Sequence, residues 1–165
     1  MENLFLRFCF TIYNWIISFF SNFQSIFIFL MRLTWGYQFL IAGYGKLMHL
    51  DKITLFFEKL GIPLATTNAT LVGGFEFFGG ILLLVGFASR LISIPLIIIM
   101  LVAYSTAHNH IFSHFAFITN PTLLVNEAPF AFLLTCLIVL LFGPGKISID
   151  GYLKRKFEEQ NTSGE

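Results

Sequence analysis

The sequence predicts an all-α integral membrane protein: a bundle of four transmembrane helices with an extra amphipathic helix at the N-terminus. Hydrophobic residues make up 56% of the 165 residues, and charged residues only 12%. A soluble domain of this size could not bury so much apolar surface, because small domains leave a large fraction of their surface exposed. In addition, four apolar stretches are each about as long as a helix needs to cross ~30 Å of hydrocarbon.

The four stretches are expected to be membrane-spanning helices, at Ile28–Lys46, Ala69–Phe87, Leu91–Ala107 and Leu123–Phe142. Pro95 falls in the first turn of the third helix, where a missing N–H is tolerated. Pro129 falls early in the fourth, where we expect a kink. The chain then divides into an N-terminal helix (1–25), a four-helix transmembrane domain (26–153) and a polar, disordered tail (154–165).

The N-terminal segment carries polar residues three or four positions apart, which puts them on one face of a helix. They are Arg7, Thr11, Asn14, Ser18, Ser21 and Ser25. Aromatic and aliphatic residues occupy the other faces, a pattern typical of a helix that lies in the membrane interface. A fifth span is the alternative interpretation. We expect a break at Ser21–Ser25, between this helix and the first span.

The distribution of Lys and Arg predicts the orientation, since these residues are enriched in cytoplasmic loops. With four spans, one side holds seven of them: Arg7, Arg32, Arg90, Lys146, Lys154, Arg155 and Lys156. The other side holds Lys46, Lys52 and Lys59. Both termini are therefore expected in the cytoplasm, with the chain in a bacterial cytoplasmic (inner) membrane. On the outer side, Asp51 is expected to cap a short surface helix that ends at Leu60, before Gly61 and Pro63.

Glu76 is the residue that points most strongly to chemistry, because it lies near the middle of the second span. A charge at that depth costs ~2.5–3.5 kcal/mol, so it normally faces the bundle interior and has a partner. Lys46, near the outer end of the first span, is the candidate partner; the alternative is that it extends to the lipid head groups. The pair is a candidate for proton handling, or else a structural contact. The neighbouring Gly73, Gly79 and Gly80 are expected to allow close helix packing.

Arg32 and Arg90 lie at the cytoplasmic ends of the first and third spans. We consider both as members, with Lys46 and Glu76, of a polar pocket that binds a cofactor. The alternative role for the two arginines is to fix the topology and contact lipid phosphates.

Three histidines follow the third span, at His108, His110 and His114. Imidazoles bind Zn or Cu and transfer protons near neutral pH, so this loop is a weak candidate metal site, and His108 is a candidate proton carrier. A solvated loop is the alternative. Cys136 is expected to be an inert thiol in the core. The net charge of +1 does not indicate a nucleic-acid partner.

Four segments, in order, give the chain a resemblance to the DoxX family of small membrane proteins. The first holds Arg32, Gly36, Phe39, Gly43 and Lys46, and the second is Leu60-Gly61-Ile62-Pro63. The third holds Glu76, Gly79, Gly80, Leu83, Gly86 and Arg90, and the fourth runs from Phe142 to Asp150. Together they cover about Met31–Leu153, whereas the N-terminal aromatic helix is longer than the usual start of the family.

The resemblance implies a four-helix membrane protein. Some members of the family are linked to sulfur or thiol redox chemistry and pass electrons to quinone. Others are accessory proteins, including some associated with the maturation or export of metal-binding peptides. The resemblance therefore favours a quinone-linked redox component that acts with a partner enzyme, soluble or membrane-bound. A metal cofactor is not expected, because the three histidines have no Cys or carboxylate nearby. A non-enzymatic accessory, transport or export protein is the alternative.

Overall fold

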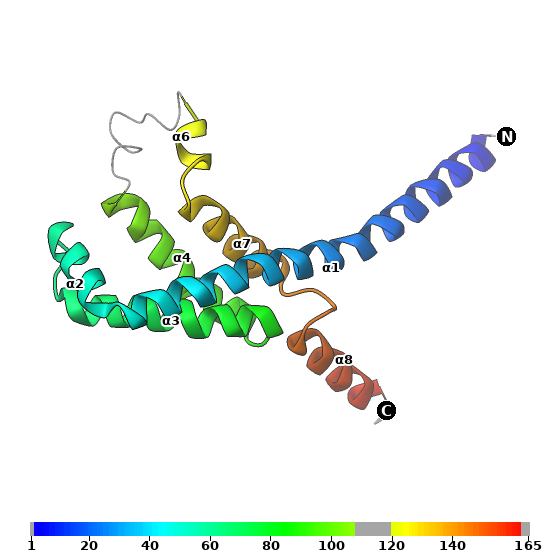
Figure 1. Cartoon of the computed structure of the whole chain (residues 1–165). Helices are drawn as coiled ribbons and strands as arrows, with labels where there is room; N and C mark the ends of the chain where they lie inside the picture. The colour runs from blue at the N-terminus through cyan, green and yellow to red at the C-terminus, as the bar shows by residue number, and fades with distance from the viewer. Residues whose placement is uncertain (1, 108–119, 163–165) are drawn as a thin grey trace.

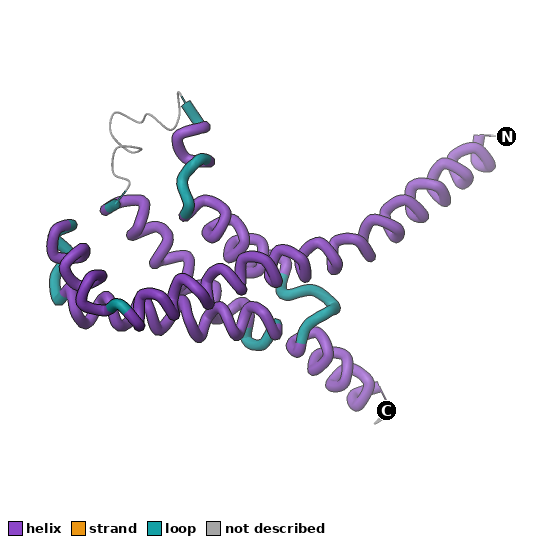
Figure 2. Tube along the Cα trace, in the orientation of Figure 1, coloured by secondary structure: helices purple, strands orange, loops and turns teal. Residues whose placement is uncertain are grey.

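The computed structural model describes residues 2–107 and 120–162, and every regular element in these ranges is a helix (Figures 1 and 2). The helices are α1 (Glu2–Met48), α2 (Leu50–Lys59), α3 (Ala65–Val85), α4 (Ser89–Thr106), α6 (Thr122–Val125), α7 (Pro129–Phe142) and α8 (Ile149–Thr162). The predicted all-α membrane fold is confirmed. Among the described residues, three helices are long and apolar enough to cross a membrane: Arg7–Met48 within α1, α3 and α4.

The fourth expected span is not one continuous helix. The range Leu123–Phe142 is split into α6 and α7, with a break at residues 126–128. Pro129 is the first residue of α7 rather than the site of a kink within it. Its ring nitrogen has no hydrogen to donate to the carbonyl of Val125, and its fixed φ suits a first helical position. Since α7 has 14 residues, it reaches only ~21 Å, and a count of four full spans stays a prediction.

Helix α1 is continuous from Glu2 to Met48, so the break expected at Ser21–Ser25 is wrong. At 1.5 Å per residue its 47 residues extend ~70 Å, about twice the thickness of a hydrocarbon core. Figure 1 shows the C-terminal half packed in the bundle and the N-terminal half extending out of it. That outer half exposes large side chains such as Phe10, Trp15 and Phe20. Its placement in the membrane interface stays a prediction.

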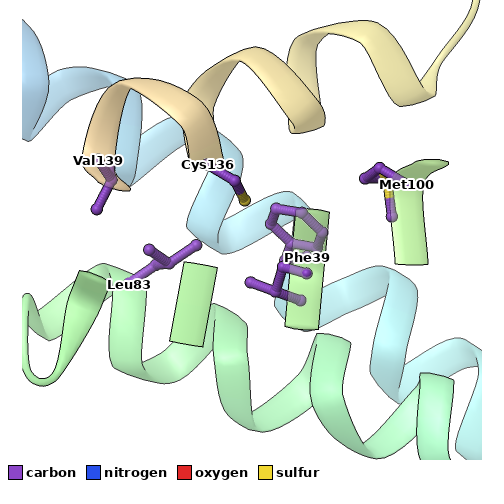
Figure 3. Packing of buried hydrophobic residues seen from close by; sticks show 6 residues of the cluster. Phe39, Leu83, Met100, Cys136 and Val139 are labelled. Atoms are coloured by element: carbon purple, nitrogen blue, oxygen red, sulfur yellow. The ribbon is translucent and has the colours of Figure 1, made fainter. Parts of the chain in front are cut away.

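The apolar core lies where α1, α3, α4 and α7 meet (Figure 3). It consists of Phe39, Leu83, Leu96, Met100, Cys136 and Val139. The ring of Phe39 lies edge-on against Phe132 of α7, with 4.5 Å between centroids. Cys136 is fully buried in this core. One or two residues from each of the four helices thus fill the centre, which fixes α7 against the longer helices.

Helices α1 and α3 run antiparallel with their backbones in contact, because glycines lie at the crossing points. A Cβ on Gly80 would stand 2.5 Å from the backbone nitrogen of Leu40. A Cβ on Gly43 would overlap the backbone of Phe77. Gly79 instead faces α4, where a Cβ would stand 3.1 Å from Leu96. The glycines therefore allow close packing on two sides of α3, as expected for membrane helices.

Three local predictions differ from the structure. Helix α2 begins after His49 with no side-chain cap, and Asp51 lies in its first turn instead. Its predicted end is confirmed, with Leu60 as C-cap and Gly61 at a φ of 72°. Helix α4 begins at Ser89, so Pro95 lies in its second turn, and the helix continues through it. The tail expected to be disordered from residue 154 is helical, since α8 runs to Thr162.

Candidate functional site

Lys46 and Glu76 meet at the contact between α1 and α3, and we call them the Lys46–Glu76 pair. Lys46 lies in the last turn of α1, and Glu76 lies midway along α3. The ammonium Nζ of Lys46 donates a hydrogen bond to Oε2 of Glu76, and the two charged groups also form an ion pair. One turn before Lys46, Gly43 brings the two backbones together, so a lysine side chain is long enough to reach the carboxylate.

Burial of the pair is asymmetric. The Glu76 side chain is 4% exposed, whereas that of Lys46 is 26% exposed. A carboxylate removed from water in this way needs a charged or hydrogen-bonding partner, and Lys46 provides both. An ammonium group has three N–H donors, and Glu76 uses one of them. The exposed part of Lys46 therefore lets a polar ligand reach the lysine, whereas the carboxylate of Glu76 stays enclosed.

Aromatic side chains lie close to the pair. The rings of Tyr44 and Phe77 are 6.3 Å apart across the α1–α3 contact, and Phe78 lies edge-on to Phe77 at 5.2 Å. Tyr44 and Phe78 are both exposed on the outside of the bundle. The polar pair is thus set beside an apolar, aromatic surface on the outside of the bundle.

Arg32 occupies a second polar position, at the C-terminal end of α3. Its side chain is fully buried. The guanidinium donates to the carbonyl of Leu83 at 3.3 Å and to that of Ile147 at 2.6 Å. Gly86, at a φ of 71°, lies so close that a Cβ there would overlap the guanidinium. Arg32 therefore joins α1 to the end of α3 and to the segment before α8.

Asp150 of α8 completes this second polar position by capping α4. Its two carboxylate oxygens accept the backbone N–H groups of Ala88 and Ser89, at 2.9 Å and 3.0 Å. Its own backbone N–H donates to the carbonyl of Gly86 at 3.0 Å. The carboxylate also attracts the guanidinium of Arg32. Asp150 was part of the family pattern in the sequence, but its capping role was not predicted, because it is far in sequence from the helix that it caps.

The four residues expected to form one polar pocket do not lie together in the structure. Lys46 and Glu76 are together, but Arg32 lies 14 residues before Lys46 on α1, which is ~21 Å along the helix. Arg90 is exposed and donates to the carbonyl of Leu141 at 3.4 Å. The loop with His108, His110 and His114 lies outside the described residues. Within 2–107 and 120–162, no group of His, Cys, Asp and Glu is arranged to hold a metal.

Replacing Asp150 with alanine is expected to lower the stability of the bundle by about 1–2 kcal/mol, the usual cost of losing a helix N-cap. Thermal unfolding of the purified protein in detergent measures this change. Asp51→Ala is the matched control, because Asp51 is exposed in the first turn of α2 and does not cap it. Equal melting temperatures for wild type and Asp150→Ala would show that the cap contributes nothing.

The DoxX family model matches residues 27–109, which is half of the chain and includes Arg32, Lys46, Glu76 and Arg90. The chain belongs to the DoxX family. A relative of this DoxX protein, uncharacterized membrane protein Rv3486 of Mycobacterium tuberculosis, is 41% identical over 71 residues. That match spans 42% of this chain and 44% of the relative, so it covers less than half of either protein. No solved structure matches the chain.

Proposed function

We propose that this DoxX protein is a quinone-linked redox component of the membrane that acts with a partner enzyme. The Lys46–Glu76 pair is the observation that carries the proposal. It places an acid and a base in contact inside the membrane-embedded part of the chain, next to an aromatic surface. Small-molecule sites typically combine such an apolar lining with a few polar groups.

The residues of the pair fit the chemistry of a quinone. A bound quinone would accept electrons, and its reduction consumes protons. Its carbonyl oxygens are hydrogen-bond acceptors, and Lys46 has N–H groups beyond the one donated to Glu76. Its ring and tail are apolar, as are the neighbouring side chains of Tyr44 and Phe77.

Each residue of the pair has a separate task in this proposal. Lys46 binds and orients a carbonyl oxygen, because its side chain is partly exposed. Glu76 holds the ammonium group in place and accepts or releases a proton within the enclosed site. Since the two groups are already hydrogen-bonded, a proton can pass between them without a rearrangement of the helices.

The proposal needs a partner, which would contribute the electron donor. The chain has two cysteines, Cys9 and Cys136, and Cys136 is enclosed in the core, so dithiol chemistry within one chain is not expected. We propose a location in the bacterial cytoplasmic membrane with both termini in the cytoplasm. The Lys46–Glu76 pair then lies toward the outer side, where it meets quinone in the hydrocarbon.

Equilibrium binding of ubiquinone-1 to the purified protein in lipid nanodiscs tests the proposal. Wild type is expected to bind saturably, and Lys46→Met and Glu76→Gln at least tenfold more weakly, which corresponds to the loss of about 1.4 kcal/mol of binding energy. Lys52→Met on the exposed side of α2 is the control and is expected to bind like wild type. Absence of saturable binding to the wild type would reject the quinone role and favour an accessory or export protein.

A further inference from the structure

Helix α8 is held at the edge of the membrane-embedded bundle by its first residues. Asp150 caps α4 and accepts from Ala88 and Ser89, and the carbonyl of Ile147 accepts from the buried Arg32. The turn between α3 and α4, from Gly86 to Ala88, connects two apolar helices and so marks a boundary of the hydrocarbon. Because α8 begins against this turn, its first two turns lie at the level of the lipid head groups.

The helix has an apolar face that is exposed. Ile149, Tyr152, Leu153 and Phe157 are spaced three, one and four residues apart, which places them on one side of a helix. Tyr152 is 59% exposed and Phe157 is 65% exposed. Figure 1 shows α8 directed away from the bundle, so this face is not part of the core around Phe39. An exposed apolar stripe next to a bilayer is expected to enter its interface.

Positive charge is concentrated in the part of the chain nearest to the bundle. Lys146, Lys154, Arg155 and Lys156 lie in or just before the first two turns of α8, whereas Glu158 and Glu159 follow them. The one acidic residue among the basic ones, Asp150, is already engaged as the cap of α4. Lys154 is also 3.7 Å from the carboxylate of Glu158, but both side chains are well exposed, so this ion pair leaves the lysine open to other ligands. The charge that faces outward from residues 146–156 is therefore basic on balance, which is complementary to anionic lipids.

We propose that α8 lies on the membrane surface and binds the head groups of anionic phospholipids through Lys146, Lys154, Arg155 and Lys156. The apolar side chains of Tyr152 and Phe157 enter the interface, and the basic side chains contact phosphates. A bilayer is favoured over a protein as the occupant because the start of α8 is fixed beside the membrane-embedded helices. The exposed face of α8 is therefore continuous with the outer surface of the helices that are expected to span the membrane.

Fluorescence of a nitrobenzoxadiazole label tests the proposal in the full-length protein, with Cys9 and Cys136 first replaced by alanine. The label is attached at Phe157→Cys or, as the control on the opposite face of α8, at Glu158→Cys. Each protein is placed in nanodiscs of pure phosphatidylcholine or of a mixture with phosphatidylglycerol. The label at position 157 is expected to shift to the blue, and lipids with a nitroxide near the head group should quench it. Both effects should be larger with phosphatidylglycerol.

Variants without the basic side chains of α8 test whether docking depends on anionic lipid head groups or only on the apolar face of the helix. The triple variant Lys154→Gln/Arg155→Gln/Lys156→Gln is expected to weaken docking in the phosphatidylglycerol mixture, by about fivefold for each charge removed. The variant Lys52→Gln/Lys59→Gln in α2 is its control and should leave docking unchanged. The proposal is overturned if positions 157 and 158 are equally accessible to water, or if docking is the same in both lipids. A blue shift that appears only after a protein extract is added would also overturn it.

Discussion

Lys46→Met is expected to destabilise the bundle by about 3 kcal/mol, because it leaves the enclosed carboxylate of Glu76 without a partner. Glu76→Gln should cost only about 1 kcal/mol, the net worth of a lost hydrogen bond. The difference arises from exposure: Lys46 is 26% exposed and can direct its ammonium group toward the head groups once the acid is gone. Glu76 has no comparable route to water.

The double variant Lys46→Met/Glu76→Gln completes the comparison, since it removes both charges at once. Unfolding by sodium dodecyl sulfate in mixed micelles measures all four proteins. The double variant is expected to be more stable than Lys46→Met, because no charge is then left alone in the site. If the losses of stability in the two single variants simply add in the double variant, Lys46 and Glu76 do not stabilise each other, and the prediction is wrong.

Gly43→Ala and Gly80→Ala are expected to destabilise the α1–α3 contact by about 3 kcal/mol each, the upper part of the range for overpacking. The added methyl group would meet backbone rather than a movable side chain: Phe77 in the first case and Leu40 in the second. The two helices must then separate. Since Lys46 lies one turn after Gly43, Gly43→Ala should also separate the ammonium group from Glu76 and weaken ligand binding at the pair.

The same helices provide matched controls for these substitutions. A Cβ on Gly45 of α1 or on Gly74 of α3 has no neighbour within 4 Å. Gly45→Ala and Gly74→Ala are therefore expected to stabilise the protein by about 0.5–1 kcal/mol, through the higher helix propensity of alanine. Unfolding in mixed micelles compares the four variants. Similar effects at all four positions would mean that propensity, and not contact between backbones, decides the outcome.

The main helices were predictable because the bilayer imposes a strong pattern on composition and length. The ranges Ala69–Phe87 and Leu91–Ala107 correspond to α3 and α4 with shifts of a few residues. The contact of Lys46 with Glu76 was one of the two alternatives considered for Lys46, since a carboxylate within an apolar span needs a partner. In these cases a single dominant energy term, the cost of placing polar groups in hydrocarbon, decides the outcome.

The predictions that failed depend on contacts between distant residues or on weak local signals. Helix α4 starts at Ser89 because Asp150, far along the chain, caps it. Contact with lipid phosphates was one role considered for Arg32, yet its side chain is buried and donates to the carbonyl groups of Leu83 and Ile147. The polar residues at 21–25 suggested a break, but their helix propensities are not low enough to interrupt α1 without a glycine or proline.

The most direct test of the account is the distance between the two side chains of the Lys46–Glu76 pair in a lipid bilayer. Solid-state NMR of protein labelled with ¹⁵N at lysine Nζ and ¹³C at glutamate Cδ measures it through their dipolar coupling, with Lys46→Arg used to assign the signal. We expect a coupling that corresponds to an ion pair, with nitrogen and oxygen within about 4 Å. A Glu76 carboxyl signal without coupling to any lysine nitrogen would contradict it.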